Sequence, residues 1–247
     1  EHESLHCLTF AAIERATSSD HEAEPVLFCV FREAEASTAH AVYSYEGQVL
    51  LVSAMTDEQA TMLWALFHQH AIEVRVAEGP RNAALSFAAR WTEATGRPHR
   101  VAMNQGLYRV TRPVMPDAAG GTLAVATERD EATVNQFINA FVAECFPEES
   151  TPAAQVAQRV RRLISAQNAY LWKNSAGEIV STAAIVRQSP NTASISLVFT
   201  PREHRGRGYG ANVVASLSHH QLRRGKNECN LYADLGNTTS TGVYERI

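Results

Sequence analysis

Residues 194–210 read SISLVFTPREHRGRGYG and carry most of the information about the fold. An apolar strand runs into Pro201, a short turn follows, and the glycine-rich run 205–210 leads directly into a predicted helix. The glycines let the backbone turn tightly and approach a ligand, and the helix start adds free N–H groups and positive dipole character. Arg205 and Arg207 add positive charge. The stretch therefore predicts a site for an anion such as a diphosphate.

Two families of phosphate-binding loop fit this stretch poorly. Gly206-x-Gly208-x-x-Ala211 satisfies the loose dinucleotide fingerprint, and Asp234 imitates its ribose-binding acid. In a dinucleotide fold, however, the strand enters the first glycine directly, whereas here a proline-led turn intervenes. Only 13 residues follow Asp234, too few for the remaining strands of such a sheet. A Walker A loop is excluded because no Gly-Lys-Ser/Thr follows the glycines.

The stretch closely resembles the signature of the GNAT superfamily of acetyl-CoA-dependent N-acetyltransferases. The family pattern, Arg or Gln followed by x-x-Gly-x-Gly or Ala after a strand that ends near a proline, is similar to residues 205–210 behind 198–201. A second part of the signature follows the next predicted strand, where Asn237 precedes Tyr244 by seven residues. The resemblance covers about residues 122–247 and implies acetyl-CoA as co-substrate, with no metal.

The resemblance also implies roles for individual residues in an acyltransferase that acetylates a primary amine on a small molecule or peptide. Tyr244 would be the general acid that protonates the thiolate of coenzyme A. Backbone amides of the strand would bind the pantetheine arm and polarise the thioester carbonyl. The implied cofactor-binding residues are Leu197, Val198, Phe199 and Thr200 on and after the strand, then Arg205, Gly206, Arg207, Gly208, Tyr209, Gly210 and Ala211 for the diphosphate, and Asn237 for the pantetheine.

The sequence departs from the family pattern in two places. Many members have a glutamate on the strand before the loop as general base, whereas Ser194, Ser196 and Thr200 supply only hydroxyls. A water chain, Glu144 or Asp234, or an amine that arrives neutral remain as alternatives for the base. The missing glutamate also leaves open an acyl-CoA sensor without turnover. The family usually continues after the tyrosine into one or two further strands, so either the sequence lacks them or another segment completes the sheet.

Residues 112–121 contain two prolines and two glycines between two regularly patterned stretches, which predicts a domain boundary. We expect an α/β (α+β) protein with two tandem GNAT-like domains, each a mixed, mostly antiparallel sheet flanked by helices. Residues 1–114 would form a degenerate domain without a cofactor loop, since the acidic, glycine-free residues 55–59 would repel a diphosphate. Residues 120–247 would form the acetyltransferase domain.

Hydrophobic periodicity and turn residues predict the elements of both halves. In the first half these are strands at 26–31, 39–45 and 48–54, a helix at 57–69, a strand at 72–77, a helix at 81–95 and a strand at about 101–110. In the second half they are a strand at 123–126, helices at 130–145 and from 151, strands at 169–173, 178–187 and 193–200, a helix at 210–224, a strand at 228–233 and a helix at 239–247.

The composition favours a cytoplasmic protein that binds neither nucleic acid nor a membrane. The net charge is −4, with no basic stripe that would bind phosphates of nucleic acid. The longest apolar runs are too short to cross a bilayer, and no leader opens the chain. Cys7, Cys29, Cys145 and Cys229 stand far apart, and the pairs His68/His70 and His219/His220 do not converge as zinc ligands would. The sequence is compatible with a homodimer.

Overall fold

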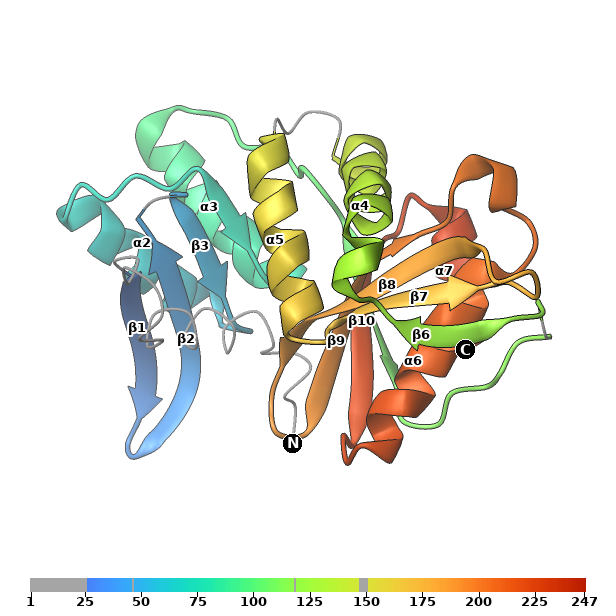
Figure 1. Cartoon of the computed structure of the whole chain (residues 1–247). Helices are drawn as coiled ribbons and strands as arrows, with labels where there is room; N and C mark the ends of the chain where they lie inside the picture. Colours follow the sequence, from blue (N-terminus) through green and yellow to red (C-terminus); the bar gives the residue numbers. More distant parts are fainter. Residues whose placement is uncertain (1–25, 46, 118, 147–150) are drawn as a thin grey trace. The chain divides into compact units, whose positions relative to one another are not determined.

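The computed structural model describes residues 26–45, 47–117, 119–146 and 151–247, so Cys7 lies outside the described residues. The chain forms two compact units, residues 1–104 and 105–247 (Figure 1). Among the described helices, none is long and apolar enough to cross a membrane.

The described part of the N-terminal unit contains a four-stranded sheet in the order β1-β2-β3-β4. The strands are β1 (Val26–Glu33), β2 (Ala36–Ser44), β3 (Val49–Val52) and β4 (Val76–Glu78), and the helices are α2 (Asp57–Gln69) and α3 (Arg81–Thr95). The first three strands are antiparallel, and β3 pairs with β4 in parallel. Leu50, Leu63, Phe67 and Phe87 are almost fully buried and join the sheet to both helices. This burial is the main favourable term in the unit's stability.

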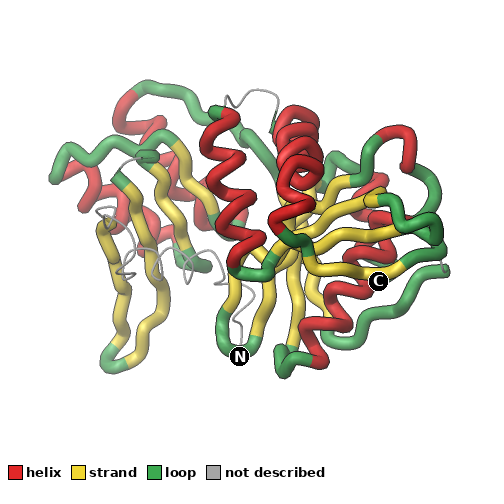
Figure 2. The backbone as a smooth tube through the Cα atoms, viewed as in Figure 1, coloured by secondary structure: helices red, strands yellow, loops and turns green. Residues whose placement is uncertain are grey.

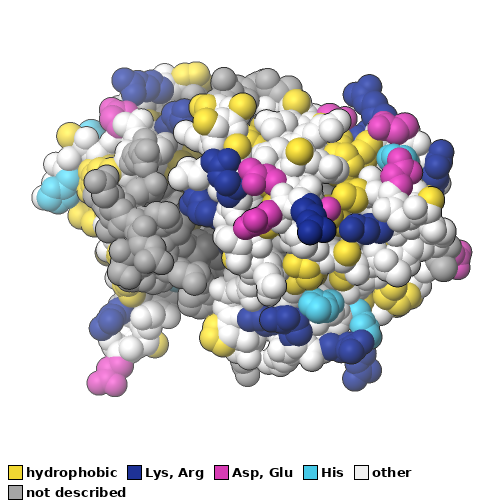
Figure 3. All heavy atoms as spheres, in the orientation of Figure 1, with side chains coloured by type: hydrophobic (Ala, Val, Ile, Leu, Met, Phe, Trp, Pro, Cys, Tyr) yellow, Lys and Arg dark blue, Asp and Glu magenta, His cyan; other side chains and the backbone are white. Residues whose placement is uncertain are grey.

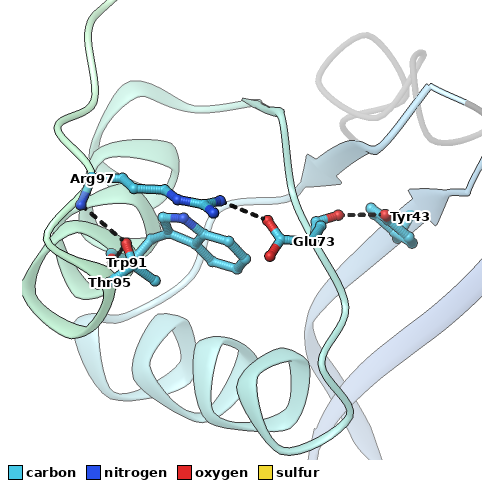
Figure 4. A network of polar contacts seen from close by, with 5 residues as sticks. All are labelled: Tyr43, Glu73, Trp91, Thr95 and Arg97. Carbon is cyan, nitrogen blue, oxygen red and sulfur yellow. Dashed lines mark hydrogen bonds and ion pairs between the residues drawn. The ribbon is translucent and has the colours of Figure 1, made fainter.

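A small polar network fixes the connection between α2 and β4. The phenol of Tyr43 donates a hydrogen bond to the carbonyl of Glu73, and the carboxylate of Glu73 pairs with Arg97 at 3.1 Å (Figure 4). The Thr95 hydroxyl donates to the carbonyl of Trp91 and accepts from the Arg97 amide, so the end of α3 is held by the same group. The network ties residues of β2, the connection and α3 together.

The described part of the C-terminal unit contains a six-stranded sheet in the order β5-β10-β9-β8-β7-β6. The strands are β5 (Gln105–Val110), β6 (Thr122–Val125), β7 (Ala169–Lys173), β8 (Ile179–Gln188), β9 (Thr192–Phe199) and β10 (Glu228–Asp234). Every pairing is antiparallel except that of β9 with β10. Such a sheet is not the doubly wound parallel sheet of a dinucleotide-binding fold.

Helices cover both faces of this sheet (Figure 2). They are α4 (Glu131–Cys145) and α5 (Ala153–Ser165) on one face, and α6 (Tyr209–Arg223) and α7 (Thr238–Tyr244) on the other. Val134 and Val160 anchor the first layer, and Val213 and Leu217 the second; all four are fully buried. Because the helices cover the two faces of the sheet, the loops at the strand ends stay uncovered, and a site can form there.

The two units share one topology. In each, two antiparallel strand pairings are followed by a parallel one, as β1-β2-β3-β4 and as β7-β8-β9-β10. In each, a helix connects the parallel strands and another helix follows, α2 and α3 in one unit and α6 and α7 in the other. The mixed, mostly antiparallel α/β architecture predicted from the sequence is confirmed.

The strand β5 lies in a different sheet from the one expected. The sequence prediction placed it at the end of a domain spanning 1–114, but it pairs antiparallel with β10, from Val110 opposite Cys229 to Gln105 opposite Asp234. The C-terminal unit therefore begins at Gln105, before the predicted linker. The pairing partners are more than a hundred residues apart in sequence, so no local pattern signals it. Another segment of the chain therefore extends the sheet beyond β10.

Candidate functional site

The parallel strands β9 and β10 separate partway along their length. Their pairing covers Thr192–Ser194 against Glu228–Asn230 and goes no further, although β9 continues to Phe199 and β10 to Asp234. The two strands thus form a V whose vertex lies at Ser194 and Asn230. Backbone groups of β9 beyond the vertex have no ladder partner on this side, which makes them available to a ligand.

A bulge in β9 lies inside this V. Two residues, Leu197 and Val198, stand opposite Ala183 of β8, between the pairs Ala184–Ser196 and Thr182–Phe199. Leu197 has a φ of 54°, a conformation that costs a residue with a Cβ of the order of 1–3 kcal/mol. The bulge shifts the alternation of the strand, so that Leu197 packs on the α4–α5 side and Val198 on the α6 side. Strain of this kind clusters at functional sites.

The glycine loop predicted from the sequence leads into α6 as expected. Gly206 and Gly208 have φ values of 75° and 78°, which residues with side chains rarely adopt, and Gly208 is the residue immediately before the helix. Among the described residues, no side chain caps this helix start. The first amides of a helix have no intrahelical acceptor. Those of Tyr209, Gly210 and Ala211 therefore form a concentrated group of donors at the positive end of the helix dipole.

The two loop arginines have different surroundings. Arg205 donates through Nε to the carbonyl of Thr200 at 2.8 Å and through Nη2 to Glu144 at 2.7 Å, and its guanidinium lies 5.6 Å from the ring centre of Phe199. Within the described ranges Arg207 makes no ion pair and is exposed. The sequence suggested that both arginines face a diphosphate. In the structure Arg205 is held by Thr200 and Glu144 and supports the loop, so Arg207 is the arginine whose charge is available to a ligand.

Glu144, at the end of α4, accepts both Arg205 and Arg202, the latter at 3.5 Å. The hydrogen bond from Arg205 and the two positive charges lower the pKa of Glu144 below its usual value. A carboxylate held this firmly in its charged form is a poor proton acceptor. Of the carboxylates considered for the general base, Glu144 is therefore disfavoured, and its contacts make it an anchor of the loop.

Tyr244 is the last residue of α7, and its ring packs against Tyr108 of β5 with centres 5.8 Å apart. Burial raises the pKa of the Tyr244 phenol to about 12, and the Cys145 thiol nearby acts in the same direction. Cys145 is in turn within electrostatic reach of Arg205 and Asp234. The ends of α4, β10 and α7 and the loop before α6 therefore converge on one region, beside the open end of the V.

The other predicted residues lie around this region. The Thr200 hydroxyl bonds to that of Ser181 at 2.9 Å, and Phe199 packs against Phe137 of α4. Asn237 begins α7, and its side-chain oxygen accepts a hydrogen bond from the Ser240 amide at 3.1 Å. Asn237 is therefore a helix cap, and any contact with a pantetheine arm would use its remaining amide group.

Sequence reasoning missed two features of this region. Cys145 was treated only as an isolated cysteine, because its neighbours Asp234 and Tyr244 are 89 and 99 residues away in sequence. A cavity of about 260 Å³ beneath Tyr244, lined among others by Ile195, Val214 and Ser218, was also not foreseen.

No group of three or more His, Cys, Asp or Glu able to hold a metal ion is found among the described residues.

Comparisons with known proteins agree with this geometry. Residues 175–247, which include the bulge, the glycine loop and Tyr244, match the family model described as FR47-like protein. No curated protein matches the chain.

Solved structures with the same fold cover nearly the whole chain. A GNAT-family acetyltransferase from Colwellia psychrerythraea aligns with 100% of this chain and 92% of its own, at 14% identity and a TM-score of 0.58. A GCN5-related N-acetyltransferase from Sphaerobacter thermophilus aligns with 96% and 80%, at 18% identity and a TM-score of 0.60. One from Kribbella flavida aligns with 84% and 81%, at 19% identity and a TM-score of 0.53. The chain therefore has the fold of GNAT acetyltransferases.

Proposed function

We propose that the protein is an acetyl-CoA-dependent N-acetyltransferase that acetylates a primary amine. The observation that carries the proposal is the V between β9 and β10, which leads directly into a glycine-framed, uncapped helix start. One end of this arrangement suits a diphosphate, and at the other the strand with the strained Leu197 and the half-buried phenol of Tyr244 pack against the same core. A linear ligand with a diphosphate and a thioester, as in acetyl-CoA, matches both ends.

The diphosphate would lie at the start of α6. Gly206 and Gly208 permit close approach of the backbone, the amides from Tyr209 to Ala211 donate hydrogen bonds, and Arg207 supplies charge. Arg205 contributes by bracing the loop against Thr200 and Glu144. Such an anion site depends mainly on backbone groups, which explains why small residues dominate the loop.

The acyl group would lie inside the V, beside the bulge. Backbone amides of Leu197, Val198 and Phe199 have no partner strand there and would polarise the thioester carbonyl and stabilise the negative charge that develops on its oxygen. The strain at Leu197 suggests that this backbone is held ready before the ligand arrives.

Tyr244 would donate a proton or a hydrogen bond to the sulfur as the thiolate leaves. Because the pKa of its phenol is raised to about 12, the group is protonated at every physiological pH. A positioned acid of this kind typically contributes about 10²- to 10⁴-fold to the rate. The acceptor would be an amine on a small molecule or peptide. Figure 3 shows acidic and basic side chains intermingled on the visible face rather than gathered in a basic patch.

The general base would be Asp234, an ordered water, or none if the amine arrives neutral. Asp234 lies at the open end of the V, where its side chain accepts a hydrogen bond from the Gly236 amide. Glu144 is bound by two arginines and is therefore a poor general base. A protein without a general base could bind acyl-CoA with little turnover, so these contacts favour an acyl-CoA sensor as a second candidate function.

One pair of measurements tests the proposal. Calorimetry with acetyl-CoA should show binding, and an assay for free thiol should show coenzyme A release with amines from a panel of polyamines, aminoglycosides, amino acids and peptide N-termini. Binding without thiol release across the panel would favour the sensor. No heat with acetyl-CoA would overturn both functions.

We further propose that the N-terminal unit is a degenerate copy of the acetyltransferase domain. The shared order and direction of β1–β4 and β7–β10 supports a duplication. The start of α2 carries Asp57 and Glu58 in place of a glycine loop, and its Thr56 and Gln59 cap each other. This unit would therefore not bind coenzyme A, and calorimetry should give one site per chain.

A further inference from the structure

The cavity beneath Tyr244 begins where the V closes. Its lining includes Ile195 and Leu231, the first residues beyond the vertex pair Ser194–Asn230. Both side chains belong to the core on the α6 side of the sheet. Val214 and Ser218 of α6 form the opposite wall. A group placed in the V and extending toward the vertex would therefore pass into this cavity on the α6 side.

Most residues of the lining are apolar, and the polar ones are Arg109, Ser218, Asn230 and Glu245 besides the two tyrosines. Ser218 lies one helical turn beyond Val214, about 6 Å further from the helix start. Ser218 is fully buried and lines the cavity, and its hydroxyl lies beside the thiol of Cys229, which is also part of the lining.

The volume fits a short alkyl chain. A water occupies about 30 Å³ in the liquid and a methylene is of similar size, so a cavity of about 260 Å³ has room for several such groups. An acetyl group would leave most of this space empty. The five carbons beyond the carbonyl of a hexanoyl group would fill the apolar part and leave room beside Ser218 for a water or a polar substituent.

We propose that this cavity is an acyl pocket and that the enzyme prefers acyl-CoA esters of about six carbons over acetyl-CoA. This inference rests on the proposed function, since it assumes that the thioester lies in the V. The chemistry of transfer is unchanged: the amine nitrogen forms a bond to the acyl carbon, the carbon–sulfur bond breaks, and coenzyme A leaves as the thiol. Only the acyl group differs.

Calorimetry with coenzyme A, acetyl-CoA and hexanoyl-CoA tests the inference without an acceptor. Each buried methylene should tighten binding roughly three- to fourfold, so hexanoyl-CoA should bind on the order of 100-fold more tightly than acetyl-CoA. Equal affinities for the two esters would overturn the inference and leave the proposed function intact. Failure of all three ligands to bind would overturn the proposed function and this inference with it.

Two variants of α6 locate the effect. Ser218→Leu fills the cavity and should reduce the affinity ratio of hexanoyl-CoA to acetyl-CoA to about one. Ser216→Leu makes the same change two residues away, outside the cavity lining, and should keep the wild-type ratio. Ser218→Ala removes the hydroxyl without adding bulk and should also keep the preference, which shows that the loss in Ser218→Leu comes from filled space. A wild-type ratio in Ser218→Leu would place the acyl chain elsewhere.

Discussion

The helices α2 and α6 occupy the same place in their two units, yet their starts have opposite character. Thr56 caps α2, its hydroxyl accepts the Gln59 amide at 3.2 Å, and Gln59 in turn accepts the Thr56 amide at 3.0 Å. Asp57 and Glu58 add negative charge to the first turn. The start of α6 has glycines, no side-chain cap and the exposed Arg207. One helix satisfies its own amides, and the other leaves them for a ligand.

The two strand pairs that these helices connect also differ from each other. β3 and β4 stay paired to Leu51 and Glu78, and Gly79 follows so closely that an added Cβ would clash with the backbone of Val52. β9 and β10 also pair over three residues, but both strands then continue unpaired with each other, to Phe199 and Asp234. A closed strand pair thus accompanies a self-capped helix, and an open pair accompanies an uncapped one. The comparison teaches that an opening in the sheet and free helix amides occur together as one ligand site.

The largest effect should come from giving α6 the acidic start of α2. Gly208→Asp places a carboxylate before the helix, where it would accept the free amides and repel a diphosphate. Like charges in contact cost several kcal/mol, so the affinity for acetyl-CoA should fall on the order of 100-fold or more in calorimetry. A Cβ at Gly208 meets its nearest atoms at 3.6 Å, an ordinary contact, so the cost to the fold is the backbone strain of a side chain at a φ of 78°.

Gly225→Asp is the matched control for this substitution. Gly225 also has a positive φ, 97°, and open space around it, but it lies beyond the other end of α6. It should bear a similar backbone strain and keep wild-type affinity. If Gly208→Asp bound acetyl-CoA normally, the start of α6 would not be the diphosphate site.

The next effect concerns catalysis rather than binding. Tyr244→Phe keeps the ring packed against Tyr108 but removes the hydroxyl, so kcat should fall about 10²- to 10⁴-fold with little change in acetyl-CoA affinity. Tyr108→Phe, the partner ring, is the control and should stay within about twofold of the wild type. Because the pKa of Tyr244 is raised to about 12, loss of its proton should cause no decline in wild-type rate below about pH 11. A kcat unchanged in Tyr244→Phe would exclude it as the acid.

A smaller effect should follow from breaking the brace of the glycine loop, that is, the ion pairs of Glu144 with Arg202 and Arg205. Glu144→Gln removes the ion pairs with Arg202 and Arg205, which are partly exposed and therefore worth about 0.5–1.5 kcal/mol together. The acetyl-CoA affinity should fall about two- to tenfold. Glu131 is also on α4, and Glu131→Gln, which breaks its ion pair with Arg161 of α5, should leave the affinity unchanged.

The pH dependence of this brace has a definite sign. Arg205 lowers the pKa of Glu144 in the folded protein, so the ion pairs contribute fully above the ordinary value of 4.5 and are lost as the pH falls through the lowered value. The difference in affinity between wild type and Glu144→Gln should therefore shrink only in acid, below pH 4.5. A difference that disappeared near neutral pH would mean that another group supports the loop.

Local patterns explain which parts of the structure were predictable. The helices at 57–69 and 81–95 were placed correctly, because capping residues, apolar spacing and the stop at Gly96 all act within a few residues. The glycine loop was predictable for the same reason. The positive φ of Leu197 was not, since nothing in its own residue type favours that conformation.

Long-range contacts account for what the sequence did not reveal. The pairing of β5 with β10, the brace between Glu144 and Arg205, and the cavity reaching Ser218 each join residues far apart in the chain. Each is decided by how elements pack rather than by their own periodicity, so a single sequence shows the participants without their pairing. The acyl pocket in particular depends on the separation of two strands.

The smallest effect should come from removing the cap of α2. Thr56→Ala removes the cap of α2 and should lower the free energy of unfolding by about 1 kcal/mol in urea titrations, with acetyl-CoA affinity unchanged. Thr61→Ala, on the same helix, removes a hydroxyl that donates to the carbonyl of Asp57 at 2.8 Å. Because alanine is the better helix former, that control should be neutral or slightly stabilising. If Thr56→Ala instead weakened acetyl-CoA binding, the start of α2 would take part in ligand binding despite its cap and its acidic first turn. The conclusion that only the start of α6 binds the ligand would then be wrong.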